Sequence, residues 1–185
     1  MDKMNDLKEL LRHDVQMLHS VELQIIEAMP AMIAAAQNPS LKQALEEHLK
    51  VTQLQHERIH QVRKMIGADE ESVENYTGIL SKLMGKGTKC KAMEGIIEEN
   101  QKVMAENLSP EVRDAAIIGG SQKIEHFEIA CYGTVRTYAQ QLGLTEVASL
   151  LQQTLDEEYR ADEMLTNLAV SSVNEKAEAG EAITA

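Results

Sequence analysis

The chain has 185 residues, enough to bury one hydrophobic core, and its formal net charge is −12. An acidic chain without a Lys/Arg cluster is not expected to bind nucleic acid or an anionic membrane. With no Trp, one Phe and only 3 Pro, and with many helix-forming residues, the composition predicts an all-α domain. Because no signal peptide or membrane-spanning stretch is evident, we expect a cytoplasmic protein. Cys90 and Cys131 are then most simply reduced thiols, although the sequence also allows a disulfide between them.

The first two predicted helices carry apolar stripes that are interrupted at mid-length. Residues 6–36 form the first helix, and its stripe, at alternating spacings of four and three, is apolar except at Glu22. Residues 40–66 form the second helix, where Ser40 and Gln43 have the spacing of a capping box. The stripe of the second helix is apolar at both ends and polar in its middle, at His48, Thr52 and Gln55.

A long connection separates this helical hairpin from the next. This connection spans residues 68–89; its acidic run at 69–72 is expected to be exposed, and a short amphipathic turn is expected at 79–84. A further helix over residues 90–106 is expected to cross the bundle. Ser109 followed by Pro110 then marks the start of the third bundle helix, because proline is tolerated at the first helical position.

The third and fourth bundle helices complete the predicted domain. The third ends at Gly143, and the fourth, capped by Thr145, continues to about residue 169. Inside the third, Gly119-Gly120 costs about 1 kcal/mol per residue in helix propensity, and the pair would allow a neighbouring helix to approach closely. The pattern then fades, so we expect a bundle over residues 1–170 and a disordered tail over 171–185.

Two carboxylates occupy the inward stripe of the third bundle helix. Glu125 and Glu128 share that stripe with Ser121, Tyr132 and Val135, where a core helix would carry leucine. Removing water from a carboxylate costs several kcal/mol, so glutamates are almost never buried unpaired. A bound cation is the simplest compensation.

An internal repeat brings further polar residues to the same level. The first bundle hairpin is similar to the second, with residues 45–52 matching residues 155–162. Two similar hairpins packed about a pseudo-twofold axis would form a four-helix bundle and bring these residues to one level. In this register the matched pairs are Glu22 with Glu125, His48 with Glu158, and Thr52 with Asp162.

These residues predict a dinuclear metal site with iron or manganese as its cofactor. Carboxylates bridge two divalent ions and neutralise their charge, and imidazole suits iron, manganese or zinc. Such bundles usually carry Glu-x-x-His on two helices; Glu57 and His60 have that spacing but lie on the outer face. The predicted ligands are Glu22, His48, Glu125, Glu128, Glu158 and Asp162, with Thr52, Gln55 and Tyr132 beside them.

Four motifs of the chain resemble those of the YciE/YciF-type bacterial stress proteins of the ferritin-like superfamily. They are His19-Ser-Val-Glu22-Leu-Gln, Leu45-Glu-Glu-His48-Leu, Lys123-Ile-Glu125-His-Phe-Glu128-Ile-Ala-Cys-Tyr132-Gly and Thr154-Leu-Asp-Glu-Glu158. The resemblance covers about residues 5–170. It implies a rubrerythrin-like four-helix bundle with an extra helix, a homodimer, and a link to stress response. It also implies ligand positions at Glu22, His48, Glu125, Glu128 and Glu158, whereas Asp162 rests on helix phase.

Each candidate residue also has a purely structural interpretation. Glu125 and Glu128 would lie on an exposed face if the helix phase were wrong by one position. His48 would be a core histidine bonded to a carbonyl, and Tyr132 an ordinary core tyrosine. Thr52 and Gln55 fit a role in holding water better than a role as ligands. The histidines off the stripe are expected to be solvated: His13, His56, His60 and His126.

Two functions of different classes are compatible with these patterns. A dinuclear iron or manganese centre would make the chain a redox metalloprotein acting on a small oxidant, peroxide or dioxygen. Alternatively, the chain is a non-enzymatic dimeric stress or scaffold protein. Its polar belt, which is the set of inward polar side chains at mid-bundle, would then be neutralised by protons or hydrogen-bonded to water. Iron storage ranks lower because it requires a shell-forming assembly, and the acidic charge disfavours a DNA-protecting role.

Overall fold

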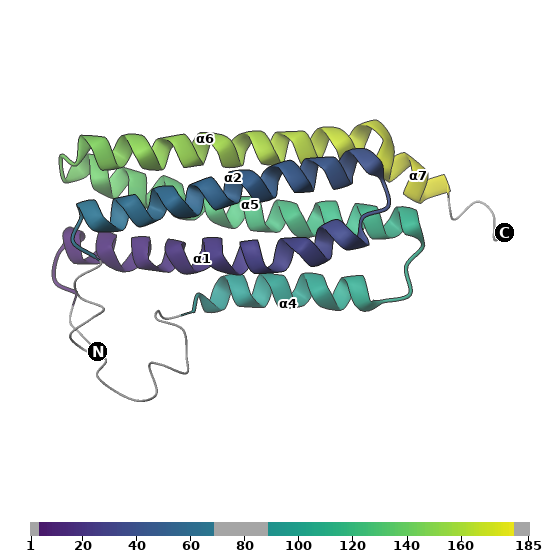
Figure 1. Ribbon diagram of the computed structural model, residues 1–185, viewed down its shortest axis with the longest axis horizontal. Helices are drawn as coiled ribbons and strands as arrows, with labels where there is room; N and C mark the ends of the chain where they lie inside the picture. Colours follow the sequence, from purple (N-terminus) through teal and green to yellow (C-terminus); the bar gives the residue numbers. More distant parts are fainter. Residues whose placement is uncertain (1–3, 69–88, 180–185) are drawn as a thin grey trace, which may run out of the picture.

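The computed structural model describes residues 4–68 and 89–179, and these residues form an all-helical bundle (Figure 1), as predicted. The amphipathic turn expected at 79–84 lies outside the described residues. Within the described ranges, no helix is both long and apolar enough to cross a membrane. The elements are α1 (Leu7–Ala35), α2 (Pro39–Met65), α4 (Lys91–Ala105), α5 (Pro110–Gln141), α6 (Thr145–Leu168), the π-helix η2 (Ala169–Val173) and α7 (Asn174–Ala179).

Four long helices form the bundle, and a fifth helix packs on its outside. Helix α1 packs against α2 and α5, while α6 packs against α5 and α2. Helices α2 and α5 run in the same direction, so the chain between them must return along the length of the bundle (Figure 1). Helix α4 makes this return while packing against α5 and α1. A single long crossover of this kind is typical of ferritin-like bundles.

The helix starts differ from prediction at two places. Asn38, not Ser40, caps α2, and its side-chain oxygen accepts the backbone N–H of Ser40 at 2.9 Å. The prediction of a capping box at Ser40 and Gln43 was wrong. Pro39 fits the first helical position, so the helix begins at Pro39. Thr145 is the first residue of α6 rather than its cap. At α5 the predicted cap is confirmed, because Ser109 accepts a backbone N–H of the first turn.

Apolar side chains fill both ends of the bundle and leave its middle polar. One apolar cluster includes Leu11, Val15, Ile59, Val135 and Leu151. A second cluster, at the other end, includes Met32, Leu41, Leu45, Ile117 and Leu165. A third lies where α4 covers α1 and α5, and it includes Val21, Ile25, Cys90, Met93 and Ile124. The polar side chains of the stripes are therefore enclosed between dry layers.

The segment predicted to be a disordered tail is helical through Ala179. Residues 169–173 form a π-helix, in which Val173 is 2% exposed and belongs to the second apolar cluster. The composition of residues 171–185 suggested solvation because it is rich in small and charged residues. A single buried valine is enough to hold the first part of this segment against the bundle. Residues 180–185 lie outside the described part of the chain.

Gly120 allows α4 to approach α5 closely, as expected for one member of the glycine pair. The Asn100 amide donates to the Gly120 carbonyl at 3.0 Å, and a Cβ on Gly120 would lie 2.8 Å from Asn100 Cγ. We expect Gly120→Ala to lower the free energy of unfolding by about 1–3 kcal/mol, measured by urea denaturation.

Gly119→Ala is the matched control for this substitution. Among the described residues, nothing lies within 4 Å of a Cβ added at Gly119. Alanine is a better helix former than glycine, so this variant should raise stability by about 0.5–1 kcal/mol. Equal effects of the two substitutions would show that the Asn100 contact does not select glycine at position 120.

Candidate metal centre

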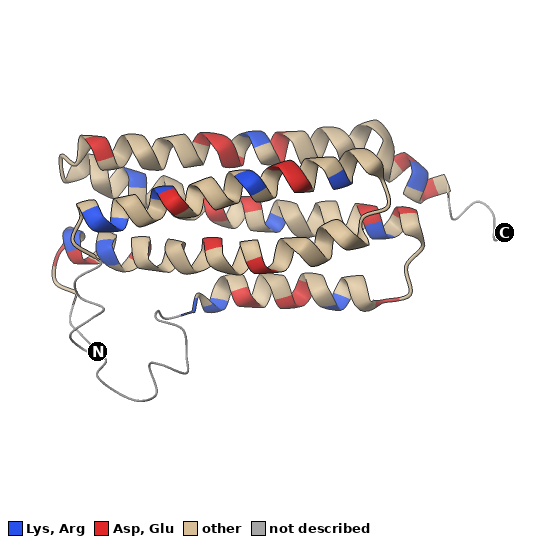
Figure 2. Cartoon of the chain, in the orientation of Figure 1, with Lys and Arg blue, Asp and Glu red and all other residues tan. Residues whose placement is uncertain are grey.

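All four bundle helices place polar side chains into the middle of the core. Acidic residues occur on each of these helices (Figure 2), but only a few face inward. The inward groups are each at most 9% exposed because the apolar stripe continues above and below them on every helix. They are Glu22 from α1, His48 and Gln55 from α2, Glu125, Glu128 and Tyr132 from α5, and Glu158 from α6.

Three of these residues, from three different helices, already approach one another closely. His48, Glu125 and Glu158 each offer one ligand atom, and these atoms all lie within 4.8 Å of one another. The Nε2 atom of His48 lies 3.2 Å from Glu125 Oε1. Imidazole and carboxylate donors converging at such distances form a mixed N/O set that suits iron, manganese or zinc.

Glu22 and Glu128 extend the group. Glu22 Oε1 accepts a short hydrogen bond from the Tyr132 hydroxyl. Burial, and then the negative charges of Glu22 and Glu125, raise the pKa of Glu128 well above its ordinary value, which places the three carboxylates near one another. The arrangement is therefore four carboxylates and one imidazole, with a tyrosine that fixes one carboxylate.

Each of the four carboxylates has one buried oxygen without a hydrogen-bond partner among the described residues. An unpartnered buried polar atom costs about 1–3 kcal/mol, and more when it is charged. Several such oxygens on the buried residues of one bundle level fit a cation-binding site better than an ordinary polar core. The atoms are Glu22 Oε2, Glu125 Oε2, Glu128 Oε1 and Glu158 Oε2.

The electrostatics of the cluster favour proton uptake when no cation is bound. Burial raises the pKa of Glu22 from 4.5 to about 8. Burial, and then the neighbouring carboxylates, raise the pKa of Glu128 and Glu158 well above that ordinary value. Burial alone would lower the pKa of His48, but the negative charges of Glu125 and Glu22 outweigh it and the pKa is raised. A cation would have to displace these protons.

A hydrogen-bond chain supports Glu158 from outside the cluster. The Gln55 amide donates to Glu158 and, at 3.1 Å, to Glu157. Arg58 pairs with the two oxygens of Glu157 at 2.8 and 3.0 Å and donates to Thr154 at 2.6 Å. Stripe periodicity missed the ion pair because both partners lie beside the inward face, and the only signal was the position of Glu157 directly before Glu158.

Two predicted residues point elsewhere. The Thr52 hydroxyl donates to the carbonyl of His48 at 3.0 Å, within its own helix. Asp162 has a side chain that is 22% exposed and lies 3.3 Å from His126 Nε2. Four residues advance an α-helix by about 400°, so Asp162 is turned about 40° away from Glu158. The structure therefore does not bring Asp162 into the group.

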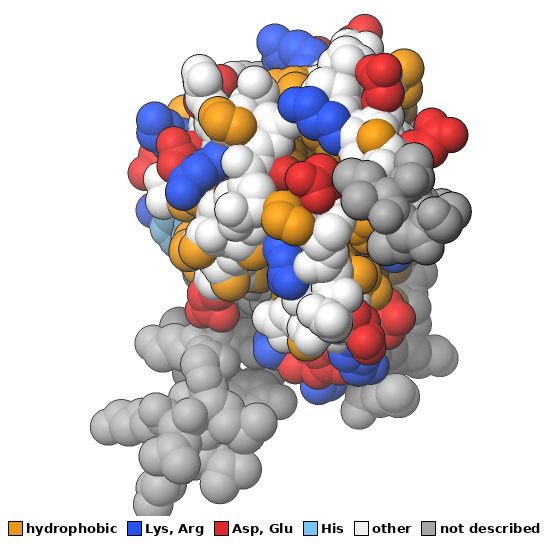
Figure 3. All heavy atoms as spheres, turned by 90° about the vertical axis from the view of Figure 1, so that its right-hand side faces the viewer, with side chains coloured by type: hydrophobic (Ala, Val, Ile, Leu, Met, Phe, Trp, Pro, Cys, Tyr) orange, Lys and Arg blue, Asp and Glu red, His pale blue; other side chains and the backbone are white. Residues whose placement is uncertain are grey.

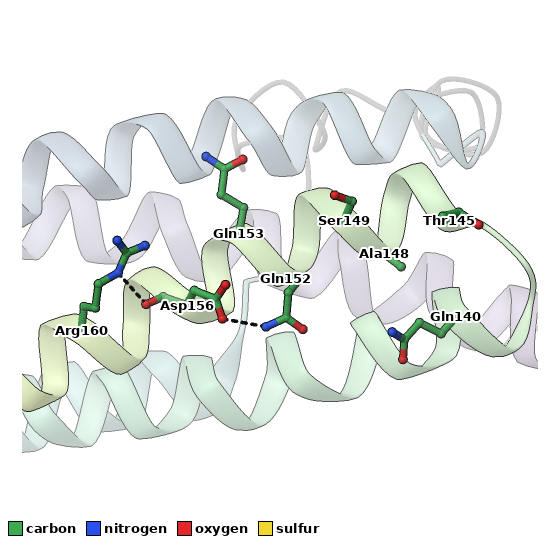
Figure 4. Close-up of a pocket in the computed structure, with 8 residues that line it drawn as sticks. All are labelled: Gln140, Thr145, Ala148, Ser149, Gln152, Gln153, Asp156 and Arg160. Atoms are coloured by element: carbon green, nitrogen blue, oxygen red, sulfur yellow. Dashed lines mark hydrogen bonds between the residues drawn. The ribbon is translucent and has the colours of Figure 1, made fainter.

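One hollow on the surface differs in character from the buried cluster. A hollow along α6 is bordered mainly by exposed polar side chains, and Figure 4 shows Arg160 and Gln152 bonded to Asp156 there. No member of the buried cluster borders this hollow. On the end face that carries α7, acidic and basic side chains are interspersed (Figure 3).

Comparison with known proteins assigns the family. The model of a family described as "Domain of unknown function (DUF892)" matches residues 6–178. The chain belongs to the DUF892 family. The DUF892 chain is 42% identical over 175 residues to protein YciF of Escherichia coli, covering 95% of this chain and 97% of YciF. The resemblance inferred from the motifs is thereby confirmed.

Solved structures give the same result for the DUF892 fold. The crystal structure of the E. coli stress protein YciF superimposes with a TM-score of 0.77, covering 92% of this chain and 99% of that chain, at 42% identity. YcfI of Rhodopseudomonas palustris gives a TM-score of 0.75 at 35% identity, covering 89% and 95% of the two chains. The ferritin-like bundle is therefore shared with these relatives.

Proposed function

We propose that this protein is a ferritin-like stress protein that binds two divalent iron or manganese ions in its core and acts on peroxide or dioxygen. The observation that carries the proposal is the convergence of Glu125 and Glu158 on His48. The charges of Glu22 and Glu128 act on the same group, and all four carboxylates have an unpartnered oxygen. The description of YciF as a stress protein supports the physiological part of the proposal.

Charge balance supports two ions rather than one. The four buried carboxylates carry four negative charges when ionised, and His48 adds none when it is neutral. One divalent ion would leave two negative charges in a dry core, which costs several kcal/mol. Two divalent ions would neutralise the set, and carboxylates that bridge two metals satisfy both of their oxygens.

The remaining residues hold this set in place. The Tyr132 hydroxyl orients one oxygen of Glu22 and leaves the other for a cation. Gln55 orients Glu158 in the same way, and Arg58 holds Glu157 beside it. Outer hydrogen bonds of this kind fix ligand geometry. Iron or manganese, when bound, would supply the electron-transfer chemistry that no protein side chain in the cluster provides.

The test is metal uptake by the full chain. After removal of metal and incubation with Mn²⁺ or Fe²⁺, elemental analysis should find up to two ions per chain. Diffraction data collected at the metal absorption edge should place them between Glu22, Glu125 and Glu158. The reconstituted protein should then consume peroxide faster than the metal-free protein. A chain that takes up neither metal would rule out the proposal.

A non-enzymatic structural role is the second candidate. YcfI has been proposed to be a structural protein. Because the pKa values of Glu22, Glu128 and Glu158 are raised, protons can neutralise these three buried side chains without a metal. In this case the protein functions through contacts between copies, in the homodimer that the family resemblance suggests. A metal-free chain that is a stable dimer by size-exclusion chromatography with light scattering would favour this role.

A further inference from the structure

Three histidines gather on the surface between α1 and α2, although the stripe pattern predicted that two of them would be solvated. His19 comes from α1, and His56 and His60 come from α2 one helical turn apart. All three are half-buried. His13 and His126, in contrast, have side chains that are 52% and 67% exposed. His13 pairs with Asp14, and His126 pairs with Asp162.

The imidazoles of His19 and His56 have the geometry of neighbouring ligands on one metal ion. Their Nε2 atoms share a hydrogen bond at 3.1 Å, in which one ring donates and the other accepts, with ring centroids 4.6 Å apart and planes inclined by 40°. Two nitrogens bound at 2.0–2.1 Å lie about 2.9 Å apart at a 90° bond angle and about 3.3 Å apart at a tetrahedral angle. The observed separation falls between these values, so a cation would require little movement of either ring.

His60 supplies a third imidazole on the same side. Its ring centroid lies 6.2 Å from that of His19, with planes inclined by 45°. Rings that share a tetrahedral ion have centroids about 5 Å apart, so His60 has to move inward by a side-chain rotation. His56 and His60 are four residues apart, so they lie on one face of α2 and point to the same side.

The chemistry of this group differs from that of the core cluster. Imidazoles that have released their protons are borderline nitrogen ligands, which suit zinc, nickel and copper, whereas iron and manganese suit a carboxylate-rich set. Burial, followed by the charges of His60 and Arg63, lowers the pKa of His56, so this side chain is neutral at pH 7 as a ligand must be. Half-exposure leaves room for water at the remaining coordination positions.

We propose that His19, His56 and His60 form a second, surface metal site for a late first-row divalent cation such as Zn²⁺. The site uses three nitrogen ligands from two neighbouring helices and completes its coordination with water. It therefore tethers α1 to α2 next to the core cluster, and it is independent of whether the core binds iron or manganese.

Zinc titration of the full chain tests the proposal, with Zn²⁺ measured by competition against a chromophoric chelator. We expect His56→Asn and His60→Asn each to weaken one Zn²⁺ equivalent by at least tenfold while leaving the circular dichroism spectrum unchanged. His13→Asn is the control, because it removes an exposed histidine that lies outside the group, and it should bind as the wild type does. The Glu125→Gln/Glu158→Gln variant should retain this zinc equivalent, which separates the surface site from the core.

Identical zinc stoichiometry and affinity in the wild type, His56→Asn and His60→Asn would overturn the surface site. Loss of the equivalent in the Glu125→Gln/Glu158→Gln variant, with retention in both histidine variants, would assign the zinc to the core and would also overturn it. Because His60 lies at the edge of the group, His60→Asn remains informative if His56→Asn disturbs folding.

Discussion

Replacing Glu125 and Glu158 together by glutamine is expected to abolish the binding of iron or manganese while leaving the helical content unchanged. Both residues belong to the group of converging ligand atoms, and glutamine keeps their shape but neither their charge nor their second acceptor oxygen. Elemental analysis after reconstitution measures the loss. Circular dichroism shows that the bundle remains folded.

The same variant is expected to be the more stable protein when metal is absent. At pH 8 the wild type must either hold protons on buried carboxylates or bury their charges, and both cost free energy. Removing the two carboxylates should raise the free energy of unfolding by about 1–4 kcal/mol. The free energy of unfolding of the wild type should rise when metal is added, because a ligand at 100 times its dissociation constant stabilises the folded state by about 2.7 kcal/mol.

A variant with the same change in charge at the surface provides the control. Glu46 and Glu163 are both exposed, so Glu46→Gln/Glu163→Gln also removes two negative charges but leaves the core intact. This variant should bind metal and respond to it as the wild type does. If both double variants lost metal, or if neither did, the core carboxylates would not be the ligands.

The metal-free wild type is expected to lose stability as the pH rises from 5 to 8. The folded protein keeps the Glu22 proton up to about pH 8, while the unfolded chain loses it near 4.5. Across this window the folded state binds more protons, so the free energy of unfolding falls with pH, by about 1.4 kcal/mol per pH unit for each such proton. Glu128 and Glu158 act in the same direction because their pKa values are also raised.

Two histidines modify this dependence without changing its sign. The pKa of His48 is raised, so its contribution is also lost as the pH rises through the folded-state value. The pKa of His56 is lowered, mainly by burial, and it opposes the trend only below its ordinary value of 6.5. The net effect between pH 7 and pH 8 is therefore a decrease in stability.

Urea denaturation at pH 5, 6, 7 and 8, with chelator and with excess Mn²⁺, measures both parts of this prediction. Metal binding replaces protons, so the stabilisation by Mn²⁺ should grow with pH. The Glu22→Gln/Glu128→Gln variant should show a flatter profile than the wild type in chelator. A metal-free wild type whose stability rises or stays constant from pH 5 to 8 would contradict the assignment of buried, protonated carboxylates.

Sequence periodicity located most of this centre. Glu22, Glu125 and Glu158 interrupt apolar stripes, and a stripe with a period of 3.6 residues identifies the buried face of a helix without reference to any other helix. The internal repeat, which matches residues 45–52 with residues 155–162, then predicted that the polar positions of the four helices lie at the same height in the bundle. The approximate ends of the helices were predictable for the same local reason, since Ser109, Pro110 and Gly143 act within their own turns.

Contacts between helices required the tertiary structure. A stripe is about 100° wide, so it could not separate Glu158, which faces the core, from Asp162, which contacts His126. It also gave no reason to pair Arg58 with Glu157, or to bring His19 beside His56. These pairings depend on how each helix is rotated about its axis against its neighbour.

The sequence by itself therefore determined the all-helical class, the polar level within the stripes and the family to which the chain belongs. The tertiary structure decided which oxygens of Glu22 and Glu158 remain without partners, and that Val173 is buried although its segment is polar in composition. The physical reason is that periodicity is a property of one helix. Burial, unpartnered atoms and shifted pKa values, in contrast, arise only when side chains from several helices share one volume.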